Sequence, residues 1–179
     1  MLKIVIPASE LFDEKSSRFI TIEEKELQME HSLVSISKWE SRWKKPFLSP
    51  DPKTRDETID YIRCMTITQN VDSCVFLGLT DQNIRDVNAY ISDKMTATTF
   101  KNSQKPGRGQ IITSEIIYYW MISFNIPMEC QKWHLNRLLT LIRVCDEKNR
   151  PGKKMSRREI ASQNRMLNQA RKAKSGSRG

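Results

Sequence analysis

The stretch SEIIYYWMISF, residues 114–124, is apolar on nearly every side of a helical wheel, and a second apolar run covers residues 128–145. A helix of the first kind needs other elements around it, so we expect it to pass through the centre of the core. Asn125-Ile126-Pro127 ends this helix, and Pro127 suits the first turn of the helix that follows. The sequence therefore predicts a core hairpin of two helices, residues 114–124 and 128–145.

Four further segments, all on the N-terminal side of this hairpin, are predicted to be helices. Apolar residues recur every three or four positions from about Met29 to Trp43. Thr54 and Glu57 form a capping box, in which each side chain can satisfy a free backbone N–H group at the start of a helix. A short helix near residues 72–77 and a helix opened by Thr80 complete a predicted bundle of five or six helices.

The N-terminal residues are typical of β structure. In residues 2–6, Leu2, Ile4 and Ile6 alternate with Lys3 and Val5. Residues 19–22 form a second β-prone run, and residues 12–17 are a polar turn between the two. A lone hairpin is marginally stable, so we expect it to pack on the helices. Residues 95–100 favour extended structure and residues 101–110 a polar loop. The predicted fold class is α+β, mostly α: an N-terminal β-hairpin of about residues 2–22 packed on a helical bundle, with a basic C-terminal helix.

Charge is distributed unevenly along the 179 residues, whose net charge is +9. Residues 148–179 hold eleven Lys or Arg and one acid, whereas the remaining residues are close to neutral, at −1. We therefore predict a globular body over residues 1–147 and a basic linker with a helical tail over residues 148–179. No apolar run is long enough to span a membrane, and the N-terminal apolar stretch is too short for a signal peptide. We expect no membrane contact and reduced cysteines.

Residues that carry chemistry are scarce. The sequence has no GxSxG, phosphate-binding GxxxxGK[ST] or HExxH motif. Cys130 and His134, with Glu129 beside them, could supply ligands to zinc, but packing at the edge of the core is favoured. His31 beside Glu30 could form a proton-transfer pair, but a surface contact near a helix start is favoured. We therefore expect no catalytic residue, no cofactor and no metal.

Two tryptophans allow a binding role as well as a structural one. Trp39 and Trp43 lie one helical turn apart among basic residues, and such a surface can stack single-stranded bases. Core packing of at least one of them is favoured, because aromatic side chains dominate core energetics. For Trp120 and Trp133, in the most apolar segments, we expect core packing.

The basic tail contains a second capping box, Ser156 to Glu159, which predicts a helix that continues to about Lys174. Its apolar residues are few, so burial against its own body would stabilise it little. Three roles remain, in decreasing order of preference: docking on a partner protein, binding of nucleic-acid phosphates, and solubility. The residues expected to bind the partner are Arg157, Arg158, Ile160, Arg165, Met166, Leu167 and Arg171.

Several phrases of the sequence are similar to segments of small proteins from tailed bacteriophages and prophages. They are MEHSLVSISKWE (29–40), YIRCMT (61–66), MTAT (95–98), IPMECQKWHLNRLL (126–139) and KKMSRREI (153–160), together with the ending at residues 167–168 and 178–179. The resemblance covers nearly the whole chain and indicates the structural and tail-assembly module of these phages.

Within that module the chain most resembles tail assembly chaperones, small helical cytosolic proteins that bind the tape measure protein while the tail tube polymerises. The resemblance implies a protein partner, the tape measure protein. The free strand edge of the predicted N-terminal hairpin could instead pair with a tail tube subunit or with a second copy of the chain. The resemblance also implies action in the host bacterial cytoplasm during assembly, and it brings no catalytic residue. One alternative is a virion structural component, such as a connector or minor tail protein, located in the virion. Another is a packaging factor that binds nucleic acid through its tail.

Overall fold

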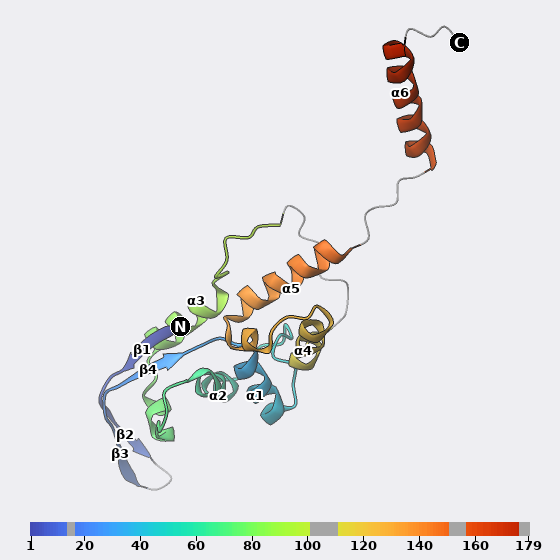
Figure 1. Ribbon diagram of the computed structural model, residues 1–179. Coiled ribbons are helices and arrows are strands. Elements are labelled where there is room, and N and C mark those ends of the chain that lie inside the picture. The colour runs from blue at the N-terminus through green and yellow to red at the C-terminus, as the bar shows by residue number, and fades with distance from the viewer. Residues whose placement is uncertain (14–16, 101–110, 151–156, 176–179) are drawn as a thin grey trace. The chain divides into compact units, whose positions relative to one another are not determined.

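The computed structural model describes residues 1–13, 17–100, 111–150 and 157–175. Helices make up 57% and strands 14% of the structure, which confirms the α+β, mostly α class (Figure 1). Contacts between residues divide the chain into two units, Met1–Cys145 and Asp146–Gly179. Among the described helices, none has the length and apolarity needed to cross a membrane.

The N-terminus forms a two-stranded antiparallel ribbon that runs to Met29. It contains four strands: β1 (Leu2–Ile6), β2 (Ser9–Asp13), β3 (Arg18–Ile22) and β4 (Lys25–Met29). β1 pairs with β4 and β2 pairs with β3, in one continuous register from the Leu2–Met29 pair to the Asp13–Arg18 pair. The expected hairpin is therefore present, but its second arm is longer than predicted and includes β4.

The ribbon is interrupted at Pro7 and Ala8, where proline has no N–H group to continue the ladder. One face of the ribbon is buried, as the alternation of β1 predicts: Ile4, Ile6, Ile22, Leu27 and Met29 are all below 5% exposed. Gly78 lies against this face, since a Cβ atom there would be 3.0 Å from the Ile6 Cγ2 atom. The ribbon thus packs closely on the helical part of the body.

Helix α1 (Leu33–Trp43) is the hub of the body, and it packs against α2, α4 and the 3-10 helix η2. Its capping box is made by Ser32 and Ser35, whose side chains each accept a hydrogen bond from the other residue's backbone N–H. The prediction that this helix begins near Met29 is wrong, because Met29 ends β4. Lys44, in the left-handed region at φ 54°, ends the helix directly after Trp43, where the predicted pattern also ends.

The next three helical segments begin at the side chains that the sequence indicates. Thr54 and Glu57 form the predicted capping box of α2 (Arg55–Met65). Asp72 caps the 3-10 helix η1 (Ser73–Gly78), and Thr80 caps α3 (Asp81–Ser92). The residues that follow, 95–100, form no strand, and Met95 has a positive φ of 50°. The predicted polar loop, residues 101–110, lies outside the described residues.

Helix α4 (Ser114–Ser123) begins at Thr113, whose side chain makes no capping hydrogen bond. Glu40 of α1 supplies the missing acceptor: its Oε2 atom accepts a hydrogen bond from the Ser114 N–H at 2.8 Å. The Oε1 atom of the same carboxylate accepts from the Phe47 N–H, also at 2.8 Å. Glu40 is buried, so one carboxylate joins α1 to the loop after it and to the start of α4.

The second apolar run forms two elements rather than one helix. Residues Met128–Lys132 are a 3-10 helix, η2, and α5 covers Leu135–Asn149. Trp133 lies between them and is half-buried. The body boundary predicted after residue 147 falls inside α5. The basic helix α6 (Arg157–Ser175) is present in the second unit, whereas Ser156 of its predicted capping box lies outside the described residues.

The expected core centre is also wrong, because the main contacts of α4 are with α1 rather than with α5. Only one face of α4 is buried: Ile117 and Met121 are 0% exposed, whereas Tyr119 and Ile122 are 66% and 67% exposed. The most deeply buried side chains come mainly from the ribbon, α1 and α2, with two residues each from α4 and α5. The apolar composition of α4 allows other elements to pack on all of its sides, but it does not show that they do.

Candidate partner-binding surfaces

His31 and His134 lie in the interior. His31 belongs to the connection between β4 and α1, and His134 to the connection between η2 and α5. Ser32 and His134 form an isolated antiparallel bridge, and the Leu135 N–H donates to the His31 carbonyl at 2.7 Å. The two imidazole rings contact edge to face, with centroids 5.1 Å apart. His31 is 2% exposed and His134 6%, so the expected surface contact of His31 is wrong.

Each imidazole has a partner that its position in sequence does not indicate. The His31 Nδ1 atom lies 2.5 Å from the Tyr61 hydroxyl. The His134 Nδ1 atom accepts from the Asn136 N–H, so its Nε2 atom carries the proton and donates to the Tyr90 carbonyl at 3.0 Å. Burial, with a smaller contribution from His134, lowers the pKa of His31 to about 3. His31 is therefore neutral at ordinary pH and acts as a structural group.

The two candidate pairs for chemistry are not assembled into sites. The Glu30 carboxylate accepts from the Tyr90 hydroxyl at 2.8 Å and pairs with the N-terminal ammonium of Met1 at 3.3 Å. Cys130 is buried, as predicted for an edge of the core, whereas Glu129 is exposed. Within the described part of the chain, no group of three or more His, Cys, Asp or Glu side chains is placed to hold a metal ion.

Trp39 closes the core, as favoured from the sequence. It is 1% exposed, and its indole N–H donates to the Glu57 carbonyl at 2.9 Å. Trp43 stacks on it with centroids 6.1 Å apart and donates to the Asp60 carboxylate. A hydrogen bond from the Lys45 ammonium, followed by one from the Thr54 backbone, lowers the pKa of Glu57. Because the faces of Trp39 are buried, this pair offers little surface for stacking bases.

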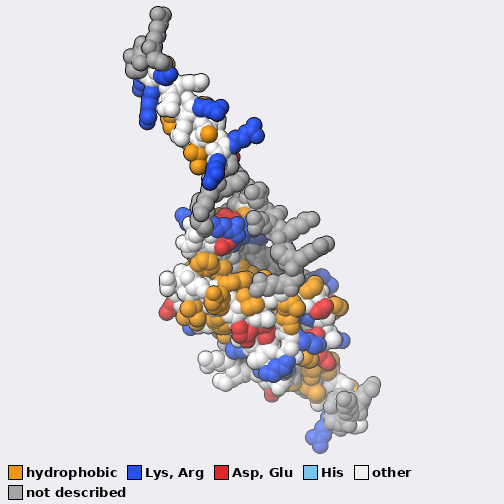
Figure 2. All heavy atoms as spheres, turned by 90° about the vertical axis from the view of Figure 1, so that its right-hand side faces the viewer, with side chains coloured by type: hydrophobic (Ala, Val, Ile, Leu, Met, Phe, Trp, Pro, Cys, Tyr) orange, Lys and Arg blue, Asp and Glu red, His pale blue; other side chains and the backbone are white. Residues whose placement is uncertain are grey.

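Helix α4 presents an apolar surface that sequence reasoning placed inside the core. Tyr119 and Ile122 lie three residues apart on its outer side, and Met128 of η2 is 45% exposed. The side of the body that Figure 2 turns toward the viewer shows hydrophobic side chains gathered in a group, with acidic side chains among them. A local signal for this surface does exist, because Glu115, Tyr119 and Ile122 share one helical face and Glu115 is charged.

Helix α6 carries every partner-binding residue expected from the sequence. All its residues from Arg157 to Lys174 are exposed, including Ile160 at 45%, Met166 at 64% and Leu167 at 49%. At 100° per residue, the apolar residues Ile160, Met166, Leu167, Ala170 and Ala173 fall within an arc of about 140°. Arg157, Arg158, Arg165, Arg171 and Lys172 fall within the opposite arc of about 140°. The structure therefore brings the expected apolar and basic residues together as two faces of one helix.

Three residues depart from this division of α6: Glu159 and Lys174 lie on the apolar side of the helix, and Ala161 lies on the basic side. The apolar face is therefore flanked by charge at both ends. Its three large side chains are too few to form a core with each other, and a face of this kind becomes buried when it meets a complementary apolar surface. The opposite, basic face adds electrostatic attraction to an acidic partner.

Comparisons of the chain with protein-family models, with curated proteins and with solved structures returned no match.

Proposed function

We propose that this protein is a phage tail morphogenesis factor that works by protein–protein binding, and specifically a tail assembly chaperone for the tape measure protein. The observation that carries the proposal is α6, a 19-residue helix with exposed apolar and basic faces. The similarity of five sequence phrases to phage and prophage proteins supports the tape measure protein as the proposed partner.

The physical case for a chaperone rests on the client's chemistry. A tape measure protein is long and largely helical, and its apolar stripes are liable to aggregate until the tail tube encloses them. A factor that covers such stripes needs an apolar face that binds reversibly. It requires neither a catalytic group nor a cofactor. In α6 the apolar face is about half-exposed at each of its three large residues and is therefore accessible to a client.

Mass spectrometry of purified virions, combined with co-purification from infected or induced cells, tests this function. The chaperone is expected to co-purify with the tape measure protein before assembly and to be absent from finished particles. Its presence in virions at fixed stoichiometry would contradict the proposal and support a connector or minor tail protein. Binding to DNA that weakens steeply with salt, without any tape measure binding, would support a packaging factor.

Separation of the tail from the body gives a second readout of the same function. A chain ending at Arg150 keeps α5 intact, including the ion pair between Arg150 and Asp146 at 2.6 Å. It retains every residue of the buried core, so we expect cooperative melting close to that of the full-length chain. It is expected to lose affinity for the tape measure protein. Aggregation or a much lower melting midpoint of the shortened chain would show that α6 belongs to the folded body.

A further inference from the structure

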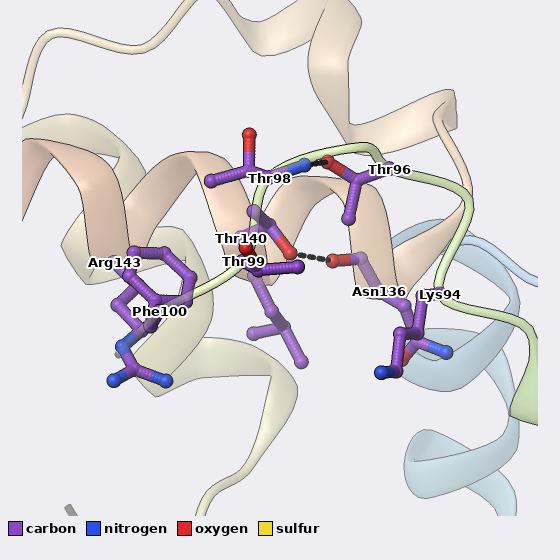
Figure 3. Close-up of a pocket in the computed structure, with 9 residues that line it drawn as sticks. Lys94, Thr96, Thr98, Thr99, Phe100, Asn136, Thr140 and Arg143 are labelled. Carbon is purple, nitrogen blue, oxygen red and sulfur yellow. Dashed lines mark hydrogen bonds between the residues drawn. The ribbon is translucent and has the colours of Figure 1, made fainter. Parts of the chain in front are cut away.

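A cavity of about 430 Å³ lies between α5 and the irregular segment that follows α3 (Figure 3). On α5 it is lined by Leu139 and by three polar residues, Asn136, Thr140 and Arg143, which are four and three residues apart and therefore share one face of the helix. The opposite wall comes from residues 94–100 and contributes Lys94 and three threonines. Its volume falls in the usual range for small-molecule sites, roughly 300–1,000 Å³.

Hydrogen bonds position both walls of this cavity. The Asn136 side-chain amide donates to the Ile91 carbonyl at 2.9 Å and to the Asp93 carbonyl at 2.6 Å. On the opposite wall, the Thr98 N–H donates to the Thr96 hydroxyl at 3.1 Å. The amide of Asn136 thus fixes the end of α3 on α5, and the segment after it starts from a defined position.

The charged side chains described in the lining are all cationic. The lining includes the ammonium of Lys94, the guanidinium of Arg143 and four threonine hydroxyls, of which that of Thr140 donates to the Asn136 carbonyl at 2.8 Å. Among the lining residues that the structure describes there is no Asp or Glu. The Arg143 guanidinium carbon lies 3.8 Å from the centroid of the Phe100 ring, an arrangement that fixes the orientation of the guanidinium plane. Cations and hydroxyls together are the groups that bind phosphate oxygens. A cavity with this lining disfavours a cationic ligand.

The two cations lie at opposite ends of the cavity in Figure 3, Lys94 beside Asn136 and Arg143 beside Phe100. Asn136 and Arg143 are two helical turns apart, about 10 Å along α5 at 1.5 Å per residue. One orthophosphate cannot contact both ends of such a cavity. We propose that it binds a small molecule with at least two linked phosphate groups, such as a diphosphate. This site is separate from α6 and does not depend on the proposed function.

Calorimetric titration of the full-length protein with inorganic pyrophosphate tests the site, with orthophosphate and citrate as comparison anions. We expect pyrophosphate to bind at least tenfold more tightly than either comparison anion. Lys94→Gln and Arg143→Lys are each expected to weaken pyrophosphate binding about tenfold, because a lysine cannot make the bidentate contact of an arginine. Arg85→Gln, on the exposed surface of α3, is the matched control and should leave the affinity unchanged.

Three results would overturn the proposal: no pyrophosphate binding, equal affinity for citrate, or affinity unaffected by Lys94→Gln and Arg143→Lys. Loss of binding in a chain that ends at Arg150, with both cavity variants unaffected, would place the anion on the basic tail instead. Lys94 is exposed, so Lys94→Gln is expected to keep the melting midpoint of the wild type and to report on binding alone.

Discussion

Replacing Glu40 by alanine is expected to lower the free energy of unfolding by about 3–5 kcal/mol, because two buried backbone N–H groups lose their acceptor at once. These are the N–H groups of Phe47 and Ser114, each 2.8 Å from a Glu40 carboxylate oxygen. An unsatisfied buried donor costs about 1–3 kcal/mol, and the removed side chain leaves a void as well. Since domains have about 5–15 kcal/mol of stability, chemical denaturation should show a large shift of the midpoint.

A graded series separates this role of Glu40 from a general loss of negative charge. Glu40→Gln keeps one good acceptor oxygen but places an amide N–H₂ against the second donor, so we expect roughly half of the alanine effect. Glu24→Ala removes an exposed carboxylate at the bend of the ribbon and should change stability by less than about 0.5 kcal/mol. Equal, small effects of Glu40→Ala and Glu24→Ala would contradict the role that we assign to Glu40, which is to join α1 to the loop after it and to the start of α4.

Acidification from pH 7 to pH 4 is expected to remove about 3 kcal/mol of stability through His31 alone. The pKa of His31 is about 3 in the folded chain and 6.5 in its unperturbed state. Between these values the unfolded state binds a proton that the folded state does not. The contribution of neutral His31 is therefore complete above pH 6.5 and is lost, at up to about 1.4 kcal/mol per pH unit, as the pH falls toward 3.

Comparison of the pH slopes of wild type and His31→Gln isolates this contribution. The variant loses the contact with Tyr61 and is less stable at pH 7, but its stability should fall less between pH 6.5 and pH 4. The carboxylates titrate in both proteins and cancel in the difference. NMR titration of the imidazole protons gives an independent check, and a His31 midpoint near pH 6.5 would show that the ring is not held neutral.

The elements that local chemistry specifies are the ones that the sequence predicts well. Thr54 and Thr80 begin helices because their side chains can cap backbone N–H groups within three residues. The two faces of α6 follow from the helical period alone. These features depend only on residues close together in the sequence, so the predictions made from them agree with the structure.

The mistaken predictions concern features that distant partners determine. Met29 fits a helical stripe together with Leu33 and Ile36, but it pairs with Leu2 of β1 and ends a strand. A short apolar segment can fit both the period of a helix and the period of a strand, and pairing with a distant strand decides between the two. The start of α4 is satisfied by Glu40, 74 residues away, and His31 is buried by Tyr61 and His134. No local pattern around these residues indicates which distant side chains will meet them.

The most direct test of the central claim, the proposal that the apolar face of α6 binds a tape measure protein, is the affinity of the full-length protein for that partner. Replacing Ile160, Met166 and Leu167 by serine is expected to weaken this binding about 100-fold, equivalent to about 2.7 kcal/mol, and to leave the melting midpoint unchanged. Tyr119→Ser with Ile122→Ser, on the exposed face of α4, is the matched control and should bind as the wild type does. Undiminished affinity of the α6 variant, or loss confined to the α4 variant, would contradict the claim and place the binding surface on the body.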